Sequence, residues 1–160
     1  MSVKNGFSLI ELMIVIVIIG FLAALSLPTF SKMIAKSKRS EAYVNLHAIY
    51  AAQKIYWAEK GTYTMNLYGQ DGAGWKPEGY RTGGAQENFY YTYGFGQGTE
   101  GINYFTGKLQ TSASFLDGAQ ADSKGFIVYA VGDIDGDGKP DIISINQDNV
   151  ITIVQDDLID

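Results

Sequence analysis

Residues 12–27 read LMIVIVIIGFLAALSL and contain a single polar side chain, Ser26. The uncharged stretch continues to Ser31, which gives it the ~20 residues that a helix needs to cross a bilayer. A secretory signal peptide instead has an apolar run of about 7 to 15 residues followed by a small-residue cleavage site. Here a carboxylate, Glu11, stands just inside the apolar run. The stretch therefore predicts a membrane-spanning helix with an unexpected acid near its start.

The rest of the composition is that of a folded protein with an uneven charge distribution. The chain has 160 residues, 46% hydrophobic and 18% charged, which suits one domain. Residues 117–160 hold ten Asp against two Lys, a net charge of −8, so nucleic-acid binding is disfavoured there. The sequence has no Cys and one His, which excludes disulfides, a thiolate nucleophile and a His-cluster metal site.

Glu11 requires an explanation because a charged side chain in hydrocarbon is costly. Insertion scales put the cost at about 2.5 to 3.5 kcal/mol at mid-membrane, so an intramembrane carboxylate is by default functional and has a partner. The following residues supply no cation before Lys32. The alternative is a side chain that reaches back to the membrane edge. Glu11 thus points to a partner outside its own segment.

The residues around Glu11 carry a specific pattern. Residues 6–15, GFSLIELMIV, are followed by Gly20, Ala23, Ala24 and Pro28. This N-terminus resembles that of type IV pilins and pseudopilins, and the resemblance extends from residue 4 to about residue 63. It implies an α+β fold in which a long N-terminal helical spine packs on an antiparallel β-sheet.

The resemblance also implies how the chain is processed and assembled. A prepilin peptidase would cut between Gly6 and Phe7 and methylate the new amino group of Phe7. Glu11 would then neutralise the Phe7 amine of a neighbouring identical subunit as it enters the filament. The implied partners are further copies of the chain, the membrane, and the inner-membrane assembly machinery with its ATPase.

We expect three segments: a leader at residues 1–6, a transmembrane and filament-core helix at 7–30, and a soluble head at 31–160. The head begins with a helix to residue 60, and Ala42, Leu46, Ile49 and Tyr56 give that helix an apolar face. Tyr43, Tyr50 and Trp57 are expected in the core, and the basic residues Lys36, Lys38 and Arg39 on a solvated face or at an anionic membrane surface. Because Pro28 removes a backbone donor, we expect a kink or local melting between Gly20 and Pro28.

Glycine-rich residues 61–88 predict a long surface loop, and residues 89–160 predict the sheet. Strand candidates lie at 89–95, where aromatic residues alternate, and at 102–109, 126–131, 141–145 and 150–154.

An acidic loop at residues 133–141 has the spacing of a calcium-binding loop. Carboxylates alternate at its start, a glycine is sixth, and an Asp is ninth, as in an EF-hand loop. The predicted Ca²⁺ ligands are Asp133, Asp135, Asp137, the carbonyl of Lys139, and Asp141. The twelfth position is Ser144 instead of Glu, and the flanks are strands, so the loop is not an EF-hand. The alternative is an acidic turn without metal.

The leading hypothesis is a structural subunit of a type IV pilus, which is not itself an enzyme. It would be held in the bacterial inner membrane and then polymerised into an extracellular filament for motility, adhesion or DNA uptake. The alternative is a major pseudopilin of a type II secretion system with a calcium-stabilised C-terminal region. A membrane-anchored calcium-dependent binding module or hydrolase finds little support, because the acidic loop is the one convergent polar set in the sequence.

Overall fold

The computed structural model describes residues 6–159, apart from the side chains of residues 27 and 28. Most of the predicted leader, residues 1–6, lies outside the described residues. The element order is one long helix followed by a sheet, which confirms the predicted α+β class. The chain divides into two compact units between Ile34 and Ala35, and each unit is described separately below.

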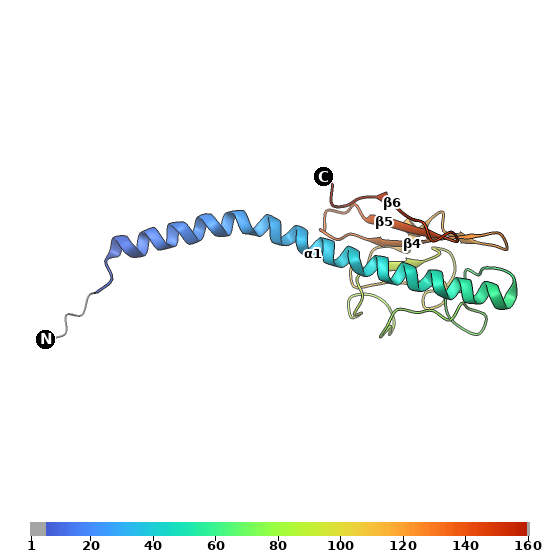
Figure 1. Cartoon of the computed structure of the whole chain (residues 1–160). Coiled ribbons are helices and arrows are strands. Elements are labelled where there is room, and N and C mark those ends of the chain that lie inside the picture. The colour runs from blue at the N-terminus through green and yellow to red at the C-terminus, as the bar shows by residue number, and fades with distance from the viewer. Residues whose placement is uncertain (1–5, 160) are drawn as a thin grey trace. The chain divides into compact units, whose positions relative to one another are not determined.

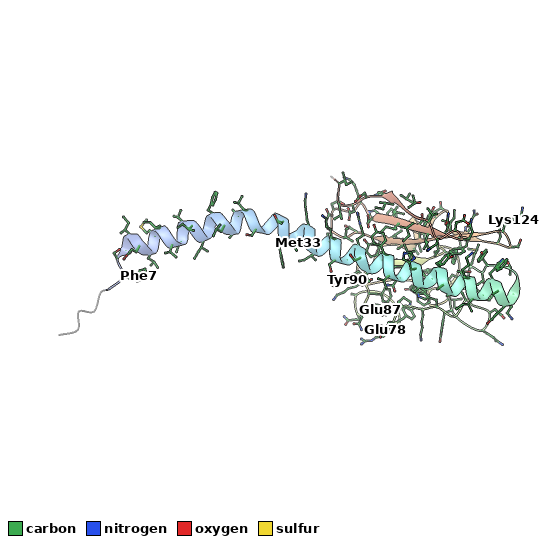
Figure 2. All side chains as sticks on the ribbon, in the orientation of Figure 1. Phe7, Met33, Glu78, Glu87, Tyr90 and Lys124 are labelled. Carbon is green, nitrogen blue, oxygen red and sulfur yellow. The ribbon has the colours of Figure 1, made fainter. Side chains whose placement is uncertain are left out.

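The first unit is the apolar part of helix α1 (Leu9–Lys60). It is long and apolar enough to cross a membrane, and its side chains are exposed in the isolated chain. Figure 2 shows these side chains projecting on all sides of the ribbon between the labelled Phe7 and Met33. A helix that is apolar all round requires an apolar environment, either lipid or other helices.

Helix α1 continues without interruption through Gly20 and Pro28, so local melting there is wrong for this structure, whereas the kink stays a prediction. Near Pro28, which has no backbone N–H to donate, two side-chain hydroxyl groups bond to carbonyl groups of the helix. The Ser26 hydroxyl donates to the Leu22 carbonyl at 2.8 Å, and the Thr29 hydroxyl to the Leu25 carbonyl at 3.5 Å.

The second unit contains the rest of α1 and an antiparallel sheet, which Figure 1 shows beside the green half of the helix. The strand order is β2-β1-β4-β5-β6, and a short β3 also pairs with β4. The strands are β1 (Thr92–Gly94), β2 (Tyr104–Phe105), β3 (Gln120–Ala121), β4 (Phe126–Gly132), β5 (Asp141–Asn146) and β6 (Ile151–Gln155). All five predicted strands are present. The first two are shorter than expected, and β3 and a short 3-10 helix, η1 (Ala113–Leu116), were not predicted.

The core lies between the helix and the sheet. From α1 it takes Ala42, Leu46 and Ile49, which have no exposed surface. From the sheet side it takes aromatic and β-branched side chains: Phe89, Tyr91, Tyr93, Phe95, Phe126, Val128, Ile143 and Ile145. The predicted aromatic stripe is only partly in this core. Tyr43 and Tyr50 pack against its edge, whereas Trp57 is 45% exposed, because it lies in the last turn and a half of the helix.

Residues 61–91 form no helix or strand, as expected for the long loop, but the loop is held tightly. Glu87, labelled in Figure 2, is buried and its carboxylate accepts the backbone N–H groups of Arg81, Thr82 and Gly83 at 2.9 to 3.3 Å. Burial alone would raise the pKa of Glu87, but these N–H groups hold it below its ordinary value. One ionised carboxylate thus orders residues 81–87 of the loop.

Candidate functional site

The N-terminal site consists of the residues around the start of α1. Gly6 and Phe7 precede the helix, and Phe7 is 81% exposed. The Glu11 carboxylate accepts hydrogen bonds from the Ser8 backbone N–H at 2.9 Å and from the Ser8 hydroxyl at 2.7 Å. In return, the Glu11 N–H donates to the Ser8 hydroxyl oxygen at 3.3 Å. This reciprocal arrangement is a capping box.

The capping box gives Glu11 hydrogen bonds but no opposite charge. Within residues 6–159, Glu11 takes part in no ion pair. Both donors from Ser8 bond the same carboxylate oxygen atom, Oε2, and the Glu11 residue is exposed in the isolated chain. The sequence pattern Ser-x-x-Glu could have revealed this cap before the structure did.

The acidic loop lies between β4 and β5 and is folded by its own carboxylates. Asp133 accepts the N–H groups of Gly136 at 2.7 Å and Gly138 at 3.0 Å. Asp135 accepts the N–H of Asp137 at 3.1 Å. Gly136 and Gly138 have φ of +88° and +92°, a region that side chains with a Cβ rarely adopt. These turns hold the three loop carboxylates on one side of the tight turn.

A fourth carboxylate joins them from the end of the chain. One oxygen atom each of Asp133, Asp135, Asp137 and Asp157 lies within 4.8 Å of the others, and we call these four residues the aspartate cluster. Asp157 is 3% exposed, and its Oδ2 accepts the Ile134 N–H at 2.8 Å. Burial raises the pKa of Asp157 to about 6, and the charges of the other three carboxylates add to this rise. Asp157 was not among the residues predicted from the sequence.

Asp141, the predicted ninth-position ligand, is not in the aspartate cluster. It is fully buried and forms an ion pair with Arg39, whose Nε lies 2.9 Å from Oδ2 and whose Nη2 lies 2.6 Å from Oδ1. The Tyr91 hydroxyl also donates to Oδ2 at 2.7 Å. The prediction that Asp141 binds the metal ion is therefore wrong. Asp141 is the first residue of β5, and its carboxylate is bonded to Arg39 of helix α1.

Arg39 is likewise not on a solvated face. It bonds both Asp141 and Asp156, and its side chain is 10% exposed. Burial alone would lower the pKa of Arg39, but the hydrogen bonds and charges of the two carboxylates raise it. Lys38 donates to the Ile134 carbonyl at 2.7 Å, at the base of the acidic loop. The Lys139 Nζ lies 3.5 Å from Asp137 Oδ2. That the Lys139 carbonyl binds Ca²⁺ stays a prediction.

Comparison with known proteins bears on the N-terminal site. A model of the prokaryotic N-terminal methylation motif matches residues 1–27. The type IV major pilin protein PilA of Myxococcus xanthus is 56% identical over 61 residues, 38% of this chain and 28% of that protein. Fimbrial protein EcpC of Eikenella corrodens is 46% identical over 62 residues, 39% of this chain and 40% of that protein. A fimbrial protein of Neisseria meningitidis is 38% identical over 65 residues, 41% of this chain and 38% of that protein.

The N-terminal part of the chain carries the prokaryotic methylation motif and is similar to that of type IV pilins. The chain spans well under half the length of the curated relatives that it matches, and the matched segments are short. The N-terminal site lies within the segment that the methylation-motif model matches, whereas the aspartate cluster lies far beyond it. Similarity and geometry together support the N-terminal site, whereas geometry alone supports the aspartate cluster.

Proposed function

We propose that this chain is a type IV pilin, a structural subunit of a type IV pilus without catalytic activity of its own. The observation that carries the proposal is the fully apolar first half of α1, exposed on all sides and interrupted near its start by one carboxylate. Burial of apolar surface contributes about 25 cal/mol per Å², so such a helix is stable in lipid or packed against identical helices. Before assembly the chain would be held in the bacterial inner membrane, and afterwards in an extracellular filament.

Processing and pairing follow from the same segment. Cleavage between Gly6 and Phe7 by a prepilin peptidase would create an α-amino group one turn before Glu11, with methylation at Phe7. Within one chain the carboxylate is already held by Ser8, while the apolar run contains no cation. We infer that the Phe7 amine of the neighbouring copy supplies the charge. Truncating one partner of a buried ion pair costs about 3 to 5 kcal/mol, enough to stop assembly.

The test is filament formation by cells that carry the variants in place of the native gene. Glu11→Ala should insert into the membrane normally, because the segment only becomes more apolar, but should give few or no surface filaments by electron microscopy. Ser8→Ala removes the helix cap and keeps the carboxylate, so it should still assemble. Glu59→Ala, an exposed acid on the same helix, is the matched control.

Normal filament yield from Glu11→Ala would refute the pairing, and equal loss from Ser8→Ala would assign Glu11 to capping instead. The pseudopilin alternative is favoured by the aspartate cluster, since some major pseudopilins hold calcium in their C-terminal region. A short periplasmic fibre at native expression, with loss of protein secretion on deletion, would support that alternative. Long surface filaments would support a pilus, whose use in motility, adhesion or DNA uptake the deletion strain can then test.

A further inference from the structure

Asp157 is a buried carboxylate with one oxygen atom that nothing in the described chain satisfies. Its Oδ2 accepts the Ile134 N–H, while its Oδ1 is buried without a hydrogen-bond partner within residues 6–159. The buried cation Arg39 bonds the neighbouring carboxylates of Asp141 and Asp156. Buried polar atoms in folded proteins are almost always paired, so an unpaired carboxylate oxygen indicates a missing partner.

The surroundings of Oδ1 show what kind of partner fits. One oxygen atom of each of three further carboxylates lies within 4.8 Å of a carboxylate oxygen atom of Asp157, and the Lys139 side chain, whose Nζ lies 3.5 Å from Asp137 Oδ2, is two-thirds exposed. Hydrogen-bond donors from a neutral ligand would leave four negative charges in contact. A divalent cation would satisfy Asp157 Oδ1 and neutralise the repulsion at once.

We propose that Asp133, Asp135, Asp137 and Asp157 bind one calcium ion, which fastens the segment after β6 to the loop between β4 and β5. The proposal does not depend on the pilus function. All four ligands are carboxylates, which suit a hard cation and not zinc or copper. At Ca–O distances of about 2.4 Å, oxygen atoms on opposite sides of the ion are about 4.8 Å apart, the same span as in the aspartate cluster.

The fold delivers the two parts of the site separately. The backbone N–H groups of Gly136, Gly138 and Lys139 orient the loop carboxylates. Asp157 is delivered by a different element, because its own N–H donates to Asp141 Oδ1 at 3.4 Å, next to the Arg39 ion pair. The ion would therefore connect two segments that are 20 or more residues apart in sequence, and order both.

The experiment uses the full chain in detergent micelles and measures calcium binding by equilibrium dialysis with radioactive calcium. The native chain should bind one ion, with a dissociation constant in the range of about 10⁻⁴ to 10⁻³ M or tighter. Asp135→Asn changes an exposed loop ligand, and it should weaken binding at least tenfold while the chain stays folded. Asp148→Asn removes the same charge from the exposed turn before β6 and should bind as the native chain does.

Hydrogen exchange of the native chain tests the role of Asp157 without a substitution. Calcium should slow amide exchange both in the loop peptide and in the C-terminal peptide that contains Asp157. Slowing in the loop alone would refute Asp157 as a ligand. Absence of binding at 10 mM calcium, or equal weakening by Asp135→Asn and Asp148→Asn, would overturn the site and leave an acidic turn. Displacement of calcium by equal magnesium would refute the choice of ion.

Discussion

Arg39→Met is the substitution expected to destabilise the second unit most clearly. Arg39 gives Asp141 two hydrogen bonds and Asp156 a third, and the Asp141 side chain has no exposed surface. Removing one partner of a buried ion pair costs about 3 to 5 kcal/mol because the other charge stays buried. Asp141 keeps the Tyr91 hydroxyl and the Asp157 N–H, so we expect the lower end, about 3 kcal/mol. For a domain of this size that lowers Tm by about 10 °C.

Both tryptophans, Trp57 and Trp75, lie in the second unit, so their fluorescence during urea unfolding reports on this unit and not on the apolar helix. Lys36→Met is the matched control, since it removes the same charge from the exposed side of the same helix and should stay within about 0.5 kcal/mol of the native chain. An unfolding free energy of Arg39→Met within that margin would refute the view that the ion pair holds the helix to β5.

Two further predictions concern the processing of the N-terminus and the buried Glu87 carboxylate. Mass spectrometry of purified filaments should find a chain that begins at Phe7 with one added methyl group, and an intact residue 1 in assembled fibres would contradict the processing. Glu87→Gln should lower the unfolding free energy at pH 7 by about 1 to 3 kcal/mol, whereas exposed Glu78→Gln should not. Since the folded-state pKa of Glu87 lies below its ordinary value near 4.5, its contribution is complete above that pH and is lost as pH falls through the lowered pKa. Native chain and Glu87→Gln should therefore converge in stability in acid, and a constant difference down to pH 3 would contradict this.

Periodicity and turn residues made most of the fold predictable from the sequence. Ala42, Leu46 and Ile49 recur at helical spacing and are buried as expected, and the alternating Tyr91 and Tyr93 are buried in and beside β1. The short β3 could not be predicted, because two residues carry no periodic signal and their pairing depends on β4. The same holds for Trp57: its spacing matches the helix stripe, but only the packing of neighbouring segments decides whether a surface is covered.

The acidic loop shows why spacing alone assigned the wrong fourth carboxylate. The spacing of the acidic residues placed Asp141 at the ninth position of a calcium loop. Asp141 is also the first residue of β5, so side chains that pack on this strand can reach it. One such residue is Arg39, about a hundred positions earlier, whose guanidinium bonds both oxygen atoms of the buried Asp141 carboxylate. The place left by Asp141 is filled by Asp157, whose proximity is set by the pairing of β5 with β6.

The two buried carboxylates, Asp141 and Asp157, differ in how their charge is neutralised. Asp141 is neutralised within the chain by Arg39, so it holds helix, strand and C-terminal segment together regardless of the solvent. Asp157 has an oxygen atom that the described chain leaves unpaired, so we expect the order of the C-terminal segment to depend on calcium in the medium. The chain has no cysteines. Its C-terminal segment is held by the ion pair of Asp156 with Arg39, and Asp157 next to it offers a site suited to a cation from the medium. If the ion pair alone sufficed, calcium would leave exchange at the C-terminal segment unchanged.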